Sequence, residues 1–192
     1  MKYKDIKSPN DLLMFMKKNF SYGYTDKNGK KHYPENKDFN LYWYDNYSLS
    51  SFEDVINNKI GNCWDLVEFE RKWFLDNGYE VNTFYEMVVL DYDNTYPTHS
   101  FLTYKDNNKY YWFEYADLVN IGIHEFNSEK ELIDYQITKY ISFLKNEFNI
   151  KEKELSKIRL YNFLKPAEKL SARKYIDFVT SGKSMKNSVV DK

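Results

Sequence analysis

Cysteine is scarce in this 192-residue chain, which contains a single one, Cys63. One cysteine excludes an internal disulfide and a paired Cys-x-x-Cys redox or metal motif. A lone thiol fits a reducing compartment, where it stays available for chemistry, so we expect a cytoplasmic protein. Closely spaced Cys and His pairs are also missing, which disfavours a zinc site built from Cys63, His99 and His124.

Long apolar runs and net charge are missing as well. No stretch approaches the roughly 18 apolar residues of a membrane span, and residues 1–7 lack the apolar region of a signal peptide. The formal net charge is −1, with both signs mixed along the chain, which excludes a strong electrostatic footprint for nucleic acid or an anionic membrane. No glycine-rich phosphate loop occurs. We therefore expect no nucleic acid, membrane, cofactor or metal as a partner, and the sequence leaves the oligomeric state open.

The remaining pattern predicts an α+β domain, because helical segments precede a run of strands that is followed by more helix and one strand. Residues 1–182 should form this one domain, and residues 183–192 a disordered tail. Helices are predicted to begin at residues 8, 50, 63, 128 and 171, with capping boxes at Ser50 and Ser128. Strands are predicted over residues 81–90, 99–104, 109–115 and 158–164. Residues 21–33 should form a hairpin around a type I′ turn at Asn28-Gly29.

Cys63 stands where the central helix, residues 63–77, should begin. Gly61 is expected to let the backbone turn sharply just before it. The N-terminus of a helix carries partial positive charge, which stabilises a thiolate beside it. Downstream the chain offers His99 and then Glu114, which is the order a thiol nucleophile, its base and the base's orienter could take.

The two strands that carry His99 and Glu114 are joined by the turn-forming stretch Lys105-Asp106-Asn107-Asn108. A two-residue turn at Asp106-Asn107 would pair His99 directly with Glu114. Directly paired residues of an antiparallel ladder point to the same face of the sheet. The register therefore predicts a carboxylate that holds the imidazole and leaves its other nitrogen for Cys63.

A Gly-x-Cys-Trp that opens a helix, a strand that begins with His and an acid one hairpin later resemble the transglutaminase-like branch of the papain-like cysteine enzymes. The resemblance covers roughly residues 50–120. It implies a Cys-bearing helix packed on an antiparallel sheet, to which this chain adds C-terminal helices. It also implies a triad of Cys63 as nucleophile, His99 as general base and acid, and Glu114 as orienter. Family members usually carry Asp in the third position, which leaves Asp117 as a rival to Glu114.

The activity that this resemblance implies is cofactor-free acyl transfer from an amide or ester, through a thioester on Cys63, with a peptide or protein as substrate. The backbone N–H of Cys63 and a second donor would hold the oxyanion, and Asn62, Trp64 and Trp43 are the candidates. The family also contains inactive relatives, so the alternative is a module that binds a peptide or protein partner in an aromatic groove. The stretch Phe39–Tyr44, which contains Trp43, would be an irregular loop that lines this groove. Of the other histidines, His124 should cap a turn or line the groove, and His32 should be exposed.

Overall fold

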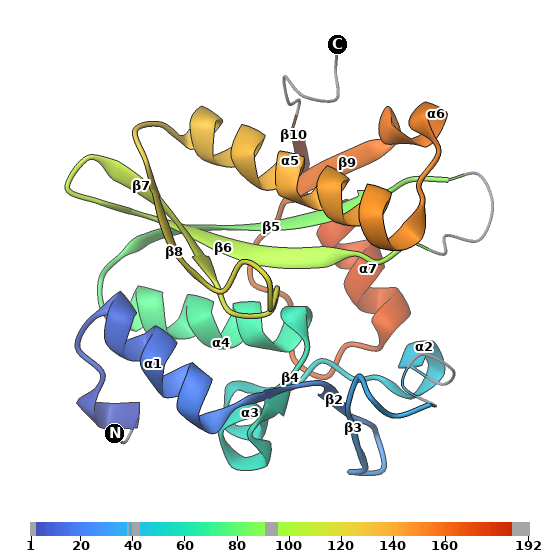
Figure 1. Cartoon of the computed structure of the whole chain (residues 1–192). Coiled ribbons are helices and arrows are strands. Elements are labelled where there is room, and N and C mark those ends of the chain that lie inside the picture. The colour runs from blue at the N-terminus through green and yellow to red at the C-terminus, as the bar shows by residue number, and fades with distance from the viewer. Residues whose placement is uncertain (1–2, 38, 40–42, 91–95, 186–192) are drawn as a thin grey trace.

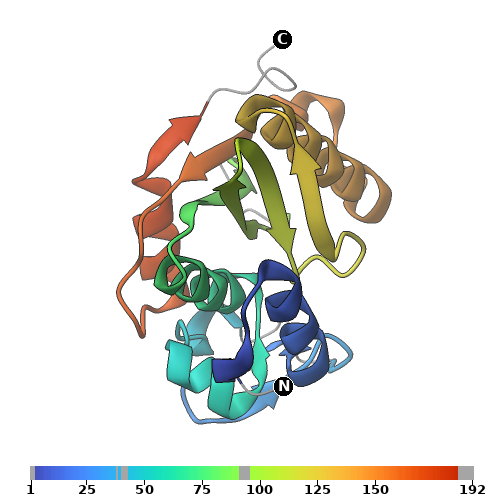
Figure 2. The same ribbon diagram turned by 90° about the vertical axis from the view of Figure 1, so that its left-hand side faces the viewer.

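The computed structural model describes residues 3–37, 39, 43–90 and 96–185. It is a mixed α+β structure in three layers, with helices above and below a central sheet (Figures 1 and 2). The sheet has six strands in the order β10-β9-β5-β6-β7-β8, and every neighbouring pair is antiparallel. Its strands are β5 (Glu80–Val88), β6 (His99–Asp106), β7 (Lys109–Glu114), β8 (Gly122–Phe126), β9 (Ile158–Asn162) and β10 (Lys183–Met185). The predicted α+β class is confirmed at this level.

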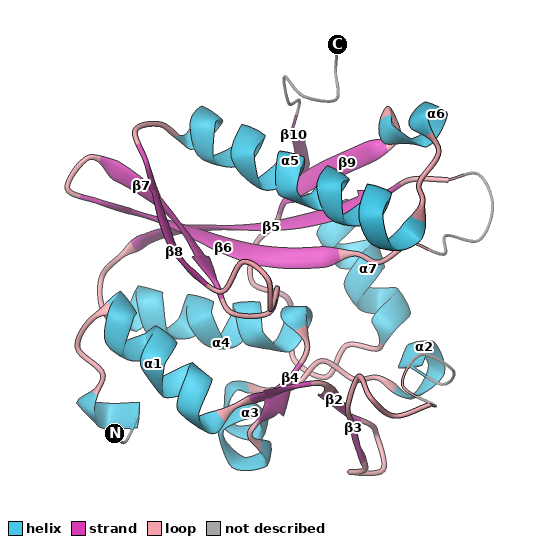
Figure 3. Ribbon diagram, viewed as in Figure 1, coloured by secondary structure: helices cyan, strands magenta, loops and turns pink. Residues whose placement is uncertain are grey.

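The helices divide between the two faces of the sheet (Figure 3). They are α1 (Pro9–Asn19), α2 (Trp43–Asn46), α3 (Phe52–Asn58), α4 (Cys63–Asp76), α5 (Glu129–Phe148), α6 (Glu152–Leu155) and α7 (Ala172–Thr180), with a 3-10 turn at Tyr3–Asp5. Helix α5 packs on one face, where Leu132, Ile133 and Ile137 meet Phe84 and Phe101. Helices α1, α3, α4 and α7 share the larger core on the other face.

The ends of the helices follow the local sequence signals. Ser8 caps α1 with Pro9 at its first position, Ser128 caps α5, and Ser171 caps α7. The capping box of α3 is formed by Ser51 and Asp54, so the prediction that placed it at Ser50 was wrong by one residue. A neighbouring pair of serines makes such a one-residue error easy, because either hydroxyl can accept from a backbone N–H three residues on.

The β6–β7 hairpin corrects the predicted register. Its two-residue turn is Asn107-Asn108, with φ of 47° and 61°, and the ladder pairs Asp106 with Lys109 and Leu102 with Phe113. A type I′ turn needs positive φ at both central positions, which two consecutive Asn residues tolerate better than Asp-Asn. The register is therefore shifted by two residues from the prediction. Because side chains alternate with a period of two, this shift leaves every side chain on its predicted face.

The N-terminal hairpin also differs from the prediction. Its strands are β2 (Tyr24–Thr25) and β3 (Lys31–His32), and only Gly29 has positive φ in the five residues 26–30 between them. A type I′ turn needs positive φ at both central residues, so the predicted type I′ turn at Asn28-Gly29 was wrong. His32, expected to be exposed, is 4% exposed and stacks on Tyr24 at 4.7 Å between ring centroids.

Two further contacts of the chain were not predicted from the sequence. Strand β1 (Ser21–Tyr22) pairs in parallel with β4 (Ile60–Gly61), which joins the N-terminal segment to the loop before α4. Residues 183–185, expected to be disordered, form strand β10 on the sheet edge, and residues 186–192 lie outside the described residues. The prediction for Asn40, Leu41 and Tyr42 also falls outside them, whereas Trp43 and Tyr44 form part of α2.

The turn assignment can be tested at Asn108, an exposed residue in the left-handed region. We expect Asn108→Ala to lower the free energy of unfolding by about 1 kcal/mol, because a Cβ without a polar side chain strains that conformation. Asn108→Gly should be at least as stable as the native protein. Urea unfolding of the three proteins measures both effects. Equal losses from Ala and Gly would contradict the turn.

Candidate active site

The first turn of α4 is fixed by a capping box that surrounds Cys63. Asn62 Oδ1 accepts hydrogen bonds from the backbone N–H groups of Trp64 and Asp65, and Asp65 Oδ2 accepts from the Asn62 N–H at 3.1 Å. The other oxygen of Asp65 accepts from the Tyr47 hydroxyl at 2.8 Å and from the Ser50 N–H at 2.7 Å. Burial raises the pKa of Asp65 to about 6, against these hydrogen bonds. Cys63 is thus the first residue of a helix whose N-terminus is held in place by hydrogen bonds that involve Asn62, Asp65 and Tyr47.

Gly61 is required at its position for a reason other than the predicted sharp turn. Its φ is not positive, and the left-handed residue that ends α3 is Lys59, with φ of 58°. A Cβ on Gly61 would lie 3.0 Å from the Asp65 Cβ and 3.1 Å from the Leu66 side chain. Gly61 therefore lets the incoming backbone lie directly against the first turn of α4.

His99 and Glu114 meet as a hydrogen-bonded pair. His99 Nε2 lies 2.8 Å from Glu114 Oε2, and the side chains are 15% and 2% exposed. Glu114 Oε2 also accepts from the Trp112 Nε1–H at 3.1 Å, and Glu114 Oε1 accepts from the Asp117 backbone N–H at 2.7 Å. Three donors therefore hold the buried carboxylate in place. In the corrected register the two residues are diagonal neighbours on one face, a separation that a long Glu side chain spans.

Asp117, the alternative candidate for orienting His99, has both side-chain oxygens in other hydrogen bonds. Its Oδ1 accepts from the Val119 N–H at 3.0 Å, and its Oδ2 accepts from the Asn120 side chain at 2.7 Å. Asp117 closes the loop after β7 and reaches the site only through its backbone, which donates to Glu114. The structure therefore pairs His99 with Glu114.

Cys63 completes the row, because its sulfur lies close enough to His99 to contribute to the pKa of the imidazole. With Nε2 engaged by Glu114, the Nδ1 nitrogen is the one left for the sulfur. Burial lowers the pKa of His99, but the charge of Glu114, its hydrogen bond and the nearby Cys63 outweigh burial and raise the pKa well above its usual value. The arrangement thus favours an imidazolium held between a sulfur and a carboxylate.

A fully buried carboxyl group, Glu86, lies directly opposite His99 on β5 and accepts a hydrogen bond from Gln136 Nε2 at 2.7 Å. Burial raises the pKa of Glu86 to about 8, so the group is mainly protonated at neutral pH. Burial likewise raises the pKa of Glu70 on α4 well above its usual value. Glu86 is thus largely neutral near pH 7, and the charge that raises the pKa of His99 comes from Glu114.

Tyr22 is a site residue that the sequence did not reveal. Its hydroxyl lies close enough to the Cys63 side chain and backbone N–H for both to shift its pKa. The parallel β1–β4 pairing places Tyr22 beside Gly61, with the Gly23 N–H donating to the Gly61 carbonyl at 3.1 Å. Burial, with the nearby Cys63, raises the pKa of Tyr22 well above its usual value, so its hydroxyl keeps its proton. A two-residue parallel pairing leaves no pattern in a sequence by which to find it.

A groove of about 780 Å³ opens beside Cys63. The three residues named from sequence as oxyanion or groove candidates, Asn62, Trp64 and Trp43, all line it. Trp64 is 1% exposed and stacks on Tyr175 at 4.3 Å, and the Trp43 ring lies edge-on to it at 4.8 Å. Asn62 acts as the helix cap, so the groove wall is formed mainly by the tryptophans and their neighbours.

His124 lies apart from Cys63, with Nε2 2.8 Å from the Asn120 carbonyl oxygen and its ring stacked on Trp112 at 4.7 Å. This is the turn-capping role expected for it. Among the residues that the structure describes, no group of three or more His, Cys, Asp and Glu side chains is arranged to hold a metal ion. Within the same ranges, none of the helices combines the length and apolar character needed to cross a bilayer.

Comparison of the chain with protein families, with characterised proteins and with solved structures finds no match in any of the three. The case for a function therefore stands on the geometry around Cys63.

The role of the Glu114 charge can be measured at His99. We expect Glu114→Gln to lower the His99 pKa, because a neutral amide no longer favours the imidazolium. Titration of the ring signals by NMR checks this, with His32 and His124 as references in the same spectrum. An unchanged His99 titration would show that the carboxylate does not control it.

The same substitution has a pH-dependent effect on stability. A raised pKa of His99 stabilises the fold fully below the unfolded value of about 6.5, and this contribution is lost as pH rises through the folded value. We expect Glu114→Gln to cost about 1.5–3 kcal/mol of unfolding free energy at pH 6, and less at high pH. Urea unfolding at several pH values gives the trend, and a constant cost would contradict it.

Proposed function

We propose that this protein is a cysteine-dependent acyl-transfer enzyme of the transglutaminase-like kind, acting on an amide or ester carbonyl. The observation that carries the proposal is the row Cys63–His99–Glu114, in which His99 is hydrogen-bonded to Glu114 and lies beside a sulfur at the N-terminus of a helix. The chain order of nucleophile, base and acid, and the placing of His and acid on adjacent antiparallel strands, support a papain-like arrangement of the core. The one difference from the usual family pattern is Glu in the third position.

In the proposed reaction the Cys63 thiolate attacks the carbonyl carbon, and a C–S bond forms. The His99 imidazolium gives its proton to the departing amine or alcohol as the bond from the carbonyl carbon to that group breaks. The acyl group stays on sulfur as a thioester. His99, now neutral, takes a proton from water or from an amine that attacks the thioester, and the thiolate and imidazolium are restored. Glu114 keeps the imidazole oriented and stabilises its charged form.

The oxyanion that forms during attack needs two hydrogen-bond donors, and the Cys63 backbone N–H supplies one. We assign the second to Tyr22, because its hydroxyl lies beside the Cys63 sulfur and the Cys63 N–H, and both residues line the groove. A substrate carbonyl oxygen that enters between them would accept from that N–H and from the Tyr22 hydroxyl.

The aromatic groove favours one alternative function. An inactive module of the same fold would use the groove beside Trp43 and Trp64 to bind a peptide or protein partner. The reactivity of Cys63 separates the two functions, because a module that only binds has no need for a thiolate at acidic pH.

Alkylation of Cys63 by iodoacetamide, followed by intact mass, tests the proposal directly, since the chain has one cysteine. We expect rapid labelling at pH 6, and a rate about tenfold or more lower in His99→Ala, because loss of the imidazolium leaves the thiolate without its partner. His124→Ala removes a histidine outside the row and should label like the native protein.

Two results would overturn the proposal. One is labelling that rises only near the ordinary thiol pKa of about 8.5. The other is equal labelling of the native protein and His99→Ala at pH 6. Either result would favour the binding module.

The role of Tyr22 is tested by Tyr22→Phe, with Tyr110→Phe at the far end of β7 as the matched control. We expect acylation by 4-nitrophenyl acetate to fall about 100-fold in Tyr22→Phe, because one oxyanion donor is lost. Iodoacetamide labelling should stay close to native, since attack on its saturated carbon develops no oxyanion. A parallel loss in both assays would assign Tyr22 to support of the thiolate.

A further inference from the structure

The groove beside Cys63 carries no charged side chain among its described lining residues, of which there are fourteen. Asp, Glu, Lys and Arg make up 30% of the chain, so about four charged residues would be expected by composition. Another cavity, of about 230 Å³ between α3, α4 and the segment after β9, has seven charged residues among its thirteen. The lack of charge is therefore a property of the groove at Cys63.

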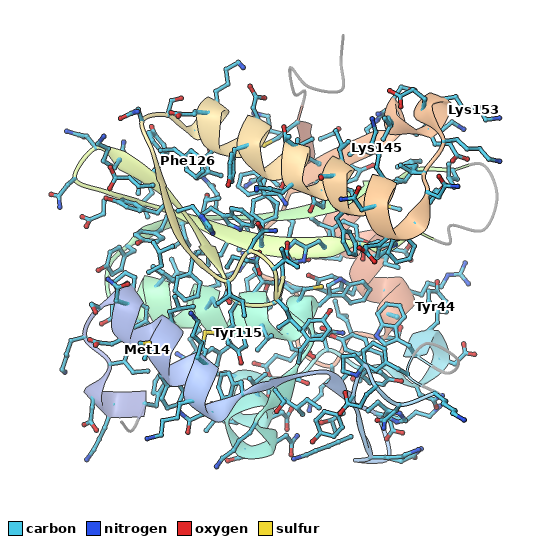
Figure 4. The ribbon with its side chains drawn as sticks, in the orientation of Figure 1. Met14, Tyr44, Tyr115, Phe126, Lys145 and Lys153 are labelled. Carbon is cyan, nitrogen blue, oxygen red and sulfur yellow. The ribbon has the colours of Figure 1, made fainter. Side chains whose placement is uncertain are left out.

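Apolar side chains from several separate elements line the groove. Trp43 and Tyr44 belong to α2, Met87 to β5, Phe148 to the end of α5 and Ile176 to α7. Tyr44 and Phe148 are 50% and 42% exposed, although both are large apolar side chains. Figure 4 shows Tyr44 standing beside α2, on the side of the molecule where α2 and α7 meet. Apolar groups left open to water around a cavity mark a surface that a ligand covers.

The position of the groove relative to Cys63 and His99 indicates which part of a substrate it would hold. Cys63 and Tyr22 line the groove, so it opens at the sulfur that keeps the acyl group and at the hydroxyl assigned to the oxyanion. Its wall also includes Pro97 and Thr98, just before His99. The groove is thereby placed at the group that remains attached to sulfur. Its volume is within the range of about 300–1,000 Å³ that is usual for ligand sites.

We propose that this groove selects the acyl part of the substrate, and that it takes an uncharged apolar or aromatic residue next to the carbonyl attacked by Cys63. The inference rests on the acyl-transfer function proposed above. An apolar side chain gains by leaving water for the ring faces of Trp43 and Tyr44 and the side chain of Met87. A carboxylate or ammonium would lose its hydration there and find no opposite charge among the described lining residues.

The test uses three irreversible probes with one electrophile, the chloromethyl ketones of N-acetyl phenylalanine, glutamate and lysine. Each forms a C–S bond with Cys63 and releases chloride, and Cys63→Ser verifies the position of labelling. We expect the phenylalanyl probe to label Cys63 at least about tenfold faster than either charged probe, relative to its rate with a free thiol. Iodoacetamide, which has no side chain, reports the reactivity of Cys63 itself.

Two exposed positions make the matched pair of variants. Phe148→Lys places a positive charge on the groove wall and should raise the rate of the glutamyl probe at least tenfold over that of the lysyl probe. Leu164→Lys makes the same kind of change at a residue that is 79% exposed and outside the groove, and should leave the order of the probes as in the native protein. Leu164→Lys should keep the native iodoacetamide rate, and the probe rates of Phe148→Lys are compared relative to its own iodoacetamide rate.

The outcomes separate the two proposals. Equal labelling by all three probes, together with fast and His99-dependent iodoacetamide labelling, would overturn the apolar selection and leave acyl transfer standing. Slow, His99-independent labelling by iodoacetamide would overturn acyl transfer, and the selection with it. Identical probe preferences in Phe148→Lys and Leu164→Lys would place the selecting surface outside the groove and so overturn the inference.

Discussion

The buried carboxylate of Glu114 is the constraint around which the site is arranged. An ionised group that is 2% exposed is costly unless it is neutralised by hydrogen bonds and an opposite charge. The Trp112 indole, the Asp117 backbone and the His99 imidazole together satisfy it. The same bond that makes the buried charge tolerable also orients the imidazole toward Cys63, so the needs of the fold and of the proposed chemistry coincide.

The second feature of the site is that the carboxyl groups near His99 differ in their pKa values. Burial keeps the pKa of Glu86 near 8 although it lies directly opposite His99, and burial also raises the pKa of Glu70 on α4 well above its usual value. A neutral Glu86 leaves the charge of Glu114 to pair with the imidazolium. A second ionised carboxylate there would compete for His99 and weaken its hold on a single orientation.

Sequence reasoning succeeded here where the signals are local. The caps of the helices, the start of α4 at Cys63 and the α+β order of elements follow from residues within a few positions of each other. The His99–Glu114 contact was predicted through a register that was wrong by two residues, and it was found because an even shift keeps both side chains on one face. Three features could not be predicted: the position of Tyr22 beside Cys63, the burial of His32 and the uncharged groove. Each depends on segments that are distant in the sequence and meet only in the folded structure, so no spacing of residues indicates it.

The short parallel ladder between β1 and β4 has a consequence for how this site comes into being. Tyr22, Cys63, His99 and Glu114 are spread over almost half of the chain, and a two-residue ladder is too small to persist without the layers packed around it. The complete constellation should therefore assemble only as the whole domain closes, and a partly folded chain would carry an ordinary cysteine. The reactivity proposed for the sulfur would then be a property of the finished fold, absent from the chain until its groove exists.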